Sequence, residues 1–514
     1  MKNHSMFWLT MVFSSLGFAL LSPLSSPIAF AQQRFAPNPA PPVVPSLREW
    51  YGGSGSFTLG SSAQILLDPV YAAQLQSTAL VFQQDLAAET GFWLPIVDAP
   101  NAGAGTFFLT FHPLDSSLGS EGYLFDVSDA VTISAQTTNG VFYGTRTALQ
   151  ILHANPAHRT IPKGFARDYP SYPERGFMLD LGRKFVPLNV LEDYVRLMSW
   201  YKFNDFQLHF NDNSITGGKS PDWQHQYAAF RLNSPAFPGL AAADGSYTEA
   251  QIRELVQVAQ QHAVTITPEI DTPAHSLALT QYRPDLASPQ DEKDFLDLGN
   301  PATAIFVHAL WQTFLPWFST SQINMGMDEY ATGDADRFRS YINASDDFFR
   351  QEGKTTRMWG SLTGMPSAIP VHTDITIEDW NNTWENPVTT VRQGFRIINA
   401  NDALLYIVPH ASYYHDFLDT QLLYTSWEPY IFDLNNPALN LQPGDPHLLG
   451  GTFSVWNDKL GNVVSVNDIT VRIEPVLPVL GEKMWSGTVA GTDYTQFEQI
   501  VQQVGFAPNT NLML

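Results

Sequence analysis

Two adjacent carboxylates, Asp328 and Glu329, close a short apolar run that begins at Ile323, and they are the pair best suited to acid–base chemistry. Neighbouring carboxylates repel each other when both are ionised, so burial can raise the pKa of one and leave the other charged. The pair therefore predicts one acid and one anion, as hydrolysis of a glycosidic bond requires. Glycosidases usually take these two groups from separated strands, so adjacency indicates a mechanism other than the ordinary two-carboxylate scheme.

The residues at other predicted strand ends suit a sugar. Trp and Tyr faces stack on the apolar faces of sugar rings, while carboxylates, Asn and Arg hydrogen-bond the hydroxyls. The alternatives are aromatic filling of a barrel top, structural ion pairs and a metal site. Metal-binding motifs such as His-x-Glu-x-x-His are absent, so we expect no metal and no cofactor. The candidates are Asp180, Arg183, His209, Asp212, Asn213, Glu269, Asp271, His275, Asp328, Glu329, Trp359, Trp380, Tyr406, Trp456 and Asp458.

Eight short apolar runs must position these residues. Helical spacing lies between several of them, over 188–201, 248–262 and 335–351. Alternation of this kind predicts an α/β fold with parallel strands, and eight units predict a (β/α)8 TIM barrel whose site lies at the C-terminal strand ends. An open doubly wound sheet is the alternative, which the lack of a glycine-rich phosphate loop after the first run disfavours. The runs are 177–181, 205–210, 264–271, 323–329, 356–359, 376–380, 404–408 and 450–456.

The segment 46–170, before the barrel of 171–514, predicts a small α+β domain. Short β-rich runs at 107–111, 123–127 and 130–134 occur with helical spacing over 71–90 and 144–152. We see no catalytic constellation in this domain. The proline-rich stretch 32–45 is predicted to be an extended linker that belongs to neither fold.

Residues 1–31 have the features of a secretory signal. Lys2 precedes an apolar run over 6–21, and Ala29-Phe-Ala31 fits the small-x-small pattern of a cleavage site. A membrane anchor is the alternative, but the run is shorter than the roughly 20 residues that a span needs. We expect a secreted, extracellular or cell-surface protein with no membrane span after signal removal.

Composition narrows the possible partners. The chain has 27 Lys and Arg against 50 Asp and Glu, a formal net charge of -23, which disfavours nucleic acid and anionic membrane surfaces. Cysteine is absent, which excludes disulfides, thiolate metal sites and a cysteine nucleophile.

Motifs in the order of the chain resemble family 20 of the glycoside hydrolases, the β-N-acetylhexosaminidases, from about residue 46 to about residue 490. The preceding domain resembles the usual N-terminal companion of that family, through 121–123 and 140–145. In the barrel the matching segments are 175–183, 202–212, 247–248, 268–275, 326–329, 456–458 and 482–485.

The resemblance implies substrate-assisted catalysis, in which the acetamido oxygen of the substrate attacks C1 and forms an oxazolinium. Asp328 would then orient the acetamido N–H and stabilise the positive charge. Glu329 would protonate the leaving oxygen and later activate water, with retention of the anomeric configuration. The substrate would be a glycan with a terminal β-linked N-acetylhexosamine.

The resemblance assigns further roles by position. Arg175 matches the arginine that binds O3 and O4 of the terminal sugar, and Asp458 would bind near O4 or O6. Either Tyr406 or Tyr414 would hydrogen-bond the acetamido oxygen. Trp359, Trp380 and Trp456 would form aromatic walls, and His209, Asp212, Asp271 and His275 would tune Glu329 from behind.

Three departures from the family pattern, Asn213, Ala274 and Asp458, resemble a subgroup found in some bacterial surface hexosaminidases and lacto-N-biosidases. Because an O3-binding Arg175 would obstruct a disaccharide, we expect an exo-acting enzyme that removes single N-acetylglucosamine or N-acetylgalactosamine units. The alternatives are a lacto-N-biosidase and a sugar-binding surface protein without catalysis.

Overall fold

A computed structural model describes residues 36–111, 115–290, 292–488 and 491–512. The predicted signal segment, 1–31, lies outside the described residues. Residues 37–514 form one compact unit. None of the helices in the described ranges combines the length and hydropathy of a membrane-spanning segment.

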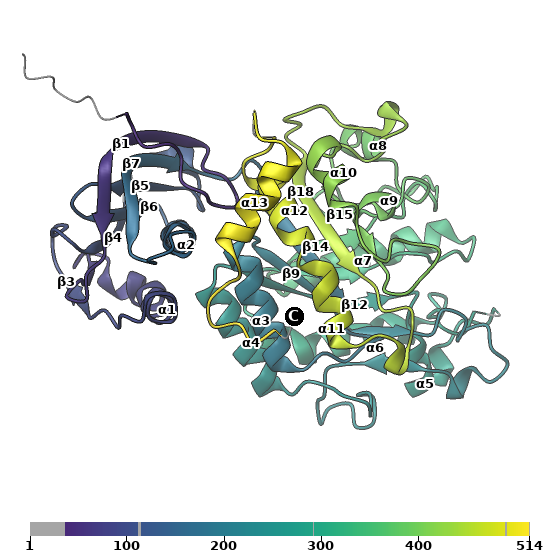
Figure 1. Cartoon of the computed structure of the whole chain (residues 1–514). Helices are drawn as coiled ribbons and strands as arrows, with labels where there is room; N and C mark the ends of the chain where they lie inside the picture. The colour runs from purple at the N-terminus through teal and green to yellow at the C-terminus, as the bar shows by residue number, and fades with distance from the viewer. Residues whose placement is uncertain (1–35, 112–114, 291, 489–490, 513–514) are drawn as a thin grey trace, which may run out of the picture. The chain divides into compact units, whose positions relative to one another are not determined.

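Eight parallel strands close into a barrel, which confirms the predicted fold (Figure 1). Closure comes from the pairing of β16 with β18, in which Ile398 lies opposite Gly450. In barrel order the strands are β8 (Glu174–Asp180), β9 (Asp205–His209), β12 (Thr265–Thr272), β13 (Gln322–Gly326), β14 (Thr355–Trp359), β15 (Thr376–Asp379), β16 (Arg396–Asn399) and β18 (Leu448–Val455).

The seventh predicted strand, over 404–408, is wrong. The chain forms the helical turn α9 (Asp402–Leu405) there, followed by β17 (Tyr406–Ile407), which pairs with β18 and is not one of the eight barrel strands. The side chain of Asn401 accepts a hydrogen bond from the backbone N–H of Ala403 and caps this turn. A short buried apolar run does not distinguish helix from strand by periodicity, and the shorter run of β16 is the true seventh strand.

Helices cover the outside of the barrel. In α4 (Glu249–Gln261), Thr248 and Gln251 form a capping box, and Ile252 and Leu255 are among the residues that pack inward. The other helices of the barrel region are α3 (Leu188–Trp200), α5 (Leu277–Tyr282), α6 (Pro301–Phe314), α7 (Ala335–Gln351), α8 (Pro387–Arg392), α10 (Thr420–Ser426), α11 (Val466–Ile473), α12 (Val476–Trp485) and α13 (Tyr494–Val504). A short hairpin, β10 (Asn211–Asn213) with β11 (Ala228–Phe230), extends the loop after β9.

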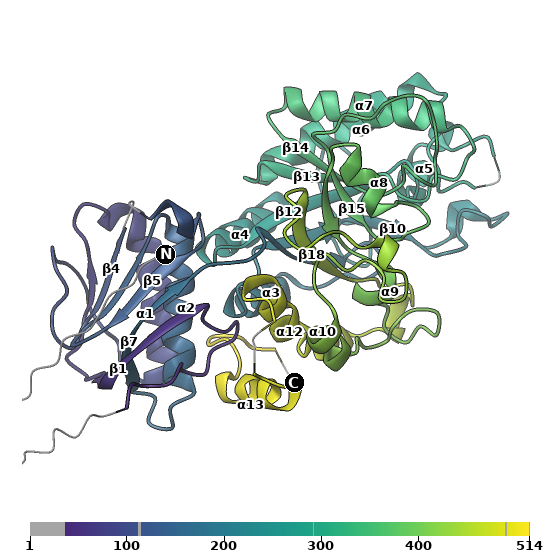
Figure 2. The same ribbon diagram turned by 90° about the horizontal axis from the view of Figure 1, so that it is seen from above.

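The preceding domain is a seven-stranded mixed sheet with two helices, the predicted α+β architecture. The helices α1 (Ala72–Thr90) and α2 (Thr138–His153) lie side by side against the sheet (Figure 2). In sheet order the strands are β1 (Glu49–Thr58), β7 (Thr160–Asp168), β5 (Tyr123–Val127), β6 (Val131–Ala135), β4 (Phe107–Phe111), β2 (Ile65–Leu67) and β3 (Ile96–Asp98).

The end of the proline-rich stretch is not a free linker. Val43 and Val44 are buried in the core, and Val44 exchanges backbone hydrogen bonds of 2.8 and 2.7 Å with the side-chain amide of Gln150. The two apolar valines at its end carry enough hydrophobic surface to anchor it, which the proline content obscures.

Buried ion pairs join the preceding domain to the barrel at the N-terminal ends of the barrel strands. Arg175, at the second position of β8, is fully buried and makes a bidentate pair with Glu121, at 2.9 and 2.8 Å. Nearby, Lys202 donates to Asp168 over 2.8 Å. These charges stabilise the junction only because each has its partner.

Replacing Glu121 by Ala is expected to lower the free energy of unfolding by about 3–5 kcal/mol, because the Arg175 guanidinium would remain buried without a carboxylate. Urea unfolding followed by tryptophan fluorescence measures the change. Glu249→Ala, which removes a solvent-exposed pair with Arg253, is the matched control and should leave stability unchanged. Equal stability of the two variants would contradict this account of the junction.

Candidate active site

A cavity of about 410 Å³ lies at the C-terminal ends of the barrel strands. Its volume is that of a small-molecule site, and its position is the one where barrel enzymes carry out catalysis. The lining residues are Arg183, Asn213, Ile215, Lys219, His275, Glu292, Asp294, Phe295, Asp328, Glu329, Ala331, Trp380, Trp384, Tyr406, Val408, Tyr413, Tyr414, Trp456 and Asp458.

The Asp328–Glu329 pair projects into this cavity from a strained turn after β13. Gly326, Met327 and Glu329 all have positive φ, at 79, 77 and 48°. Such backbone is unfavourable for residues other than glycine and persists where the surrounding structure enforces it. The turn places the two carboxylates differently: Asp328 is nearly buried, whereas 48% of the Glu329 side chain is exposed.

The two carboxylates have opposite pKa shifts. Burial raises the pKa of Asp328, and the charge of Glu329 adds to the increase. Burial also opposes ionisation of Glu329, but the hydrogen bond and charge of His275 prevail and lower its pKa. The shifts separate the two groups in the expected way, but it is the pKa of Asp328 that is raised and the pKa of Glu329 that is lowered.

Asp271 lies behind Asp328. Burial raises its pKa well above the ordinary value, and the neighbouring charge of Asp328 adds to the increase, so Asp271 is expected to be protonated. Among the described residues, no hydrogen-bond partner reaches either of its carboxyl oxygens. A neutral acid at this position can donate to the Asp328 carboxylate when that group ionises.

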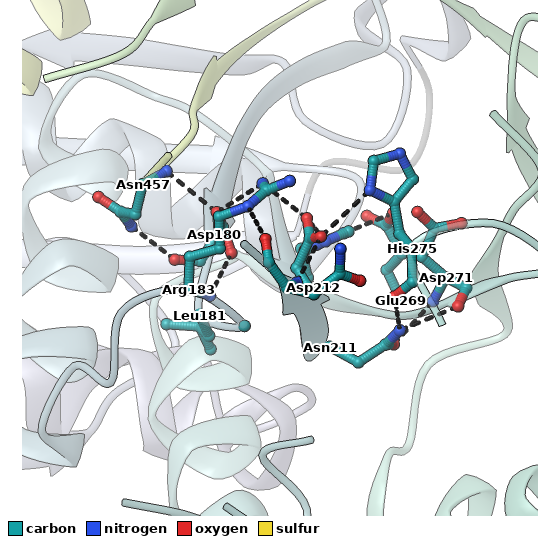
Figure 3. A network of polar contacts seen from close by, with 12 residues as sticks. Asp180, Leu181, Arg183, Asn211, Asp212, Glu269, Asp271, His275 and Asn457 are labelled. Atoms are coloured by element: carbon teal, nitrogen blue, oxygen red, sulfur yellow. Dashed lines mark hydrogen bonds and ion pairs between the residues drawn. The ribbon is translucent and has the colours of Figure 1, made fainter. Parts of the chain in front are cut away.

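His275 connects Glu329 to Asp212. Its Nε2 lies 3.2 Å from Glu329 Oε2, and its Nδ1 lies 3.1 Å from Asp212 Oδ1 (Figure 3). Burial disfavours the imidazolium, but the charges of Asp212 and Asp328 raise the pKa of His275 well above its ordinary value. The raised pKa favours the imidazolium, which holds a proton next to Glu329.

Arg183 is the arginine of the cavity. Its Nη1 lies 3.1 Å from Asp180, 2.6 Å from Asp212 and 3.5 Å from Asp458. Its Nε donates to the carbonyl oxygen of Asn213 over 2.8 Å. For Nη2, the described residues offer no hydrogen-bond acceptor, and Arg183 lines the cavity, so this donor is available to a ligand.

The role predicted for Arg175 does not fit its position. Arg175 lies near the N-terminal end of β8, whereas the cavity lies at the C-terminal end, and its guanidinium is committed to Glu121. Arg183 is among the strand-end candidates of the sequence, and its ion pair with Asp180 is also present, at 3.1 Å. Its position three residues after the last residue of β8 is the signal that identifies it.

The aromatic candidates separate into cavity walls and support. Trp380, Tyr406 and Trp456 line the cavity, with the rings of Trp380 and Tyr406 stacked at 6.4 Å. Trp359 is fully buried behind Trp456 and does not line the cavity, and its indole N–H donates to Glu269 over 2.7 Å.

Both candidate tyrosines reach the cavity. The hydroxyl of Tyr414 donates to Asp402 over 3.1 Å. No described residue hydrogen-bonds the Tyr406 hydroxyl, and the Tyr406 ring lies against Trp380 and Trp456. Tyr406 is therefore the better placed of the two for a ligand.

Some cavity residues carried no signal in the sequence. They lie on loops, where no periodicity marks a functional position. Tyr413 donates to Asp458 over 3.0 Å, and Asp458 is the carboxylate nearest to Arg183 on that side of the cavity. The others are Ile215, Lys219, Glu292, Asp294, Phe295, Ala331, Trp384 and Val408.

Three groups of side chains around the cavity have the donor types of a metal site. In one of them, His209, Glu269 and Asp271, the raised pKa values of His209 and Asp271 favour protonated groups over metal ligands. Asp180, His209 and Asp212 form another, with ligand-type atoms within 4.8 Å of one another. The Arg183 guanidinium contacts both carboxylates of this group and neutralises their charge. In the third group, Asp271, His275 and Asp328, the raised pKa values of Asp271 and His275 favour protonated groups over metal ligands.

Comparison with known proteins agrees with this geometry. The family description "Glycosyl hydrolase family 20, catalytic domain" matches residues 172–488, and "Glycosyl hydrolase family 20, domain 2" matches residues 40–169. A solved beta-hexosaminidase from Streptomyces plicatus superposes with a TM-score of 0.74 at 20% identity, covering 91% of this chain and 95% of that one.

Two curated relatives are similar in sequence. A lacto-N-biosidase from Bifidobacterium bifidum is 24% identical over 503 residues. The match covers 91% of this chain but only 42% of the length of that protein. Beta-hexosaminidase subunit A2 from Dictyostelium discoideum is 25% identical over 73% of this chain and 70% of its own length. Because the catalytic-domain match alone covers more than half of its length, the chain belongs to glycosyl hydrolase family 20.

Proposed function

We propose that the chain is a retaining exo-β-N-acetylhexosaminidase that uses the acetamido group of its substrate as the nucleophile. The observation that carries this proposal is the Asp328–Glu329 pair, set on a strained turn in a barrel-mouth cavity with His275 behind it. The two carboxylates can act on neighbouring points of one sugar, the 2-acetamido group and the glycosidic oxygen. The names of the hexosaminidase relatives support the same reaction.

In the first step the acetamido oxygen attacks C1 while the C1–O bond to the leaving group breaks. Glu329 gives its proton to the leaving oxygen, and Asp328 accepts a hydrogen bond from the acetamido N–H and stabilises the positive oxazolinium. In the second step water attacks C1 and gives its proton to Glu329, while the bond from C1 to the acetamido oxygen breaks and the neutral acetamido group is restored. Each step inverts C1, so the product retains the β-configuration.

In the reaction Glu329 must carry a proton and Asp328 must be ionised, whereas the pKa shifts favour ionised Glu329 and neutral Asp328. A bound sugar excludes water from Glu329, which favours its neutral form, and His275 Nε2 is 3.2 Å away with a proton to give. The acetamido N–H and the developing positive charge favour ionised Asp328, and Asp271 can donate to it. The acid and the anion thereby take the roles that the reaction needs.

His275→Gln is expected to move the alkaline limb of the kcat/KM profile to lower pH by about one unit or more. The raised pKa of His275 keeps one proton on the His275–Glu329 pair as pH rises. Without the imidazole, that proton is lost as pH passes the pKa of Glu329 alone. Rates on an aryl β-N-acetylglucosaminide between pH 4 and 9 measure the shift, and an unmoved alkaline limb would argue against proton storage on His275.

Nη2 of Arg183 and the carboxylate of Asp458 are placed to hydrogen-bond hydroxyls of the terminal sugar. Tyr406 would then hydrogen-bond the acetamido oxygen, and Trp380 and Trp456 would pack against the sugar ring. Arg183→Lys keeps the charge next to Asp212 but loses the planar fork. We expect kcat/KM to fall about 10- to 100-fold, which corresponds to the free energy lost with one hydrogen bond to a charged group. A kcat/KM equal to that of the parent would remove Arg183 from sugar recognition.

Release of a disaccharide is the second candidate, favoured by the similarity to a lacto-N-biosidase over 91% of the chain. The predicted obstruction by Arg175 does not apply, because that side chain lies at the other end of the barrel. Product analysis on aryl β-N-acetylglucosaminide and aryl β-lacto-N-bioside separates the two activities. Single N-acetylhexosamine products support the exo-acting enzyme, and lacto-N-biose release supports the alternative.

We propose further that residues 1–31 direct secretion and are removed, which the composition of that segment supports. Expression in a secreting host and N-terminal sequencing of the exported protein test this. A mature N-terminus at Gln32 is expected, and an intact N-terminus at Met1 would overturn the proposal.

A further inference from the structure

Two further buried titratable side chains, His209 and Glu269, lie behind Asp212. His209, on β9, is fully buried and faces a carboxylate with each ring nitrogen. Its Nε2 lies 2.9 Å from Asp212 Oδ2, and its Nδ1 lies 2.8 Å from Glu269 Oε1. With the contacts of His275, this gives one continuous line of polar groups from Glu329 to Glu269.

Three side chains hydrogen-bond to the carboxylate of Glu269. Its Oε1 accepts from both the Trp359 indole, over 2.7 Å, and His209 Nδ1, and its Oε2 accepts from Gln207 over 2.8 Å. The indole N–H can only donate, so the oxygen that it shares with His209 must be an acceptor. As a carboxylate, Glu269 has no proton to donate, so in this contact Nδ1 of His209 carries the proton.

The charge of the ring depends on the second carboxylate. A neutral His209 with its proton on Nδ1 would turn the lone pair of Nε2 toward the ionised Asp212, which is repulsive, and only the imidazolium can donate to both carboxylates. Burial opposes the imidazolium, but Glu269 and Asp212 together raise the pKa of His209 well above its ordinary value. Asp212 itself has a pKa far below the ordinary value, because Arg183 and the two histidines outweigh the effect of burial.

We infer that Glu269 is a positioning residue for catalysis: its charge keeps His209 doubly protonated, and His209 in turn holds Asp212 in the place where it orients His275 toward Glu329. This inference rests on the proposed function. The charged and titratable groups around His209 are Asp180 at the end of β8, Arg183 after β8, Asp212 on β10, Glu269 and Asp271 on β12, and His275 beyond Asp212.

The discriminating variant is Glu269→Gln, which removes the charge and keeps the shape. The amide oxygen can accept from both His209 and Trp359, and the amide N–H₂ can donate to Gln207, whose Oε1 has no partner among the described residues. With only Asp212 left as an anionic partner, His209 loses its second proton at lower pH. We expect kcat near the parental value at pH 5 and about tenfold below it at pH 8, since one pH unit in a limb is a tenfold change in the active fraction.

Two control variants separate charge from structure. Glu269→Asp keeps the charge and should keep the parental alkaline limb, even where kcat falls. Gln207→Leu removes a different donor from Glu269 and leaves the His209 contact intact, so its pH profile should match that of the parent. If Glu269→Gln and Glu269→Asp lose activity equally at every pH, the carboxylate has only a structural role and the inference fails.

A double variant tests the route of the effect. If Glu269 acts through His275, then adding Glu269→Gln to His275→Gln should change kcat at pH 8 by less than about twofold, because coupled residues are not additive. An additional loss of about tenfold would show that Glu269 acts independently of the histidine, which would overturn the inference.

A readout without turnover separates failure of this inference from failure of the proposed function. The raised pKa of His209 contributes stability that is complete below about pH 6 and is lost as pH rises through the folded-state pKa. The difference in Tm between the parent and Glu269→Gln should therefore be largest below about pH 6 and narrow toward pH 9. A Tm difference independent of pH would overturn the inference, whereas a parent that hydrolyses no N-acetylhexosaminide would overturn the proposed function alone.

Discussion

Replacing Glu329 by Gln is expected to lower kcat by roughly 10²- to 10⁴-fold on substrates whose leaving group needs a proton, such as chitobiose. Glutamine keeps the size of the side chain and a hydrogen bond to His275, but it cannot deliver a proton to the glycosidic oxygen. A dinitrophenolate leaving group needs no proton, so formation of the oxazolinium from a dinitrophenyl glycoside should be much less affected. The ratio of the two losses is the measurement.

The leaving-group dependence separates chemistry from damage to the fold. A misfolded variant loses activity on every substrate in the same proportion, and its unfolding transition changes. Equal losses on chitobiose and the dinitrophenyl glycoside, with an intact unfolding transition, would mean that Glu329 is not the proton donor.

Replacing Asp328 by Asn is the second large effect, an expected fall in kcat of about 10²- to 10³-fold. The amide is close in size to the carboxylate but has no charge to stabilise the oxazolinium, and it can present an N–H toward the acetamido N–H. The positive charge develops whatever the leaving group is, so the loss should be similar on chitobiose and on the dinitrophenyl glycoside. That pattern is the opposite of the one for Glu329→Gln.

Asp328→Asn also tests the view that the chain binds sugars without catalysis. Direct titration with N-acetylglucosamine measures binding by the parent and the variant without turnover. If Asp328→Asn hydrolyses the aryl glycoside at the parental rate, the pair is not catalytic and the binding role becomes the better account.

The strongest signals in the sequence predict the correct architecture, but they do not identify which arginine reaches the cavity. Strand–helix alternation predicted the barrel, because parallel strands buried on both faces leave continuous apolar runs. Arg175 and Arg183 lie at opposite ends of β8, and the motif contains both without showing which end holds the sugar. The order of residues along one strand decides this, since only side chains near its C-terminal end reach the cavity.

Several resemblance motifs belong to the junction with the preceding domain. Glu121, Arg175 and Lys202 are buried there, and Trp485 donates to Asp168 over 3.0 Å. Buried charges are costly unless paired, so such positions are as restricted as catalytic ones. A motif alone therefore does not distinguish a residue that binds the sugar from one that joins two domains.

Trp359 and Glu269 show a related limit. A tryptophan at a strand end was expected to form a wall of the site, but Trp359 is fully buried and supports Glu269 through its indole N–H. The line from Glu269 to Glu329 joins residues from three segments of the chain, which only the folded barrel brings together.

The central claim is that the acetamido oxygen of the substrate is the nucleophile. Aryl β-glycosides of N-acetyl-, N-fluoroacetyl-, N-difluoroacetyl- and N-trifluoroacetylglucosamine test it most directly, because each fluorine withdraws electron density from that oxygen with little change in size. The account predicts that kcat/KM falls steeply at each step of the series. A flat series, or a glycosyl adduct covalently bound to the protein, would contradict it.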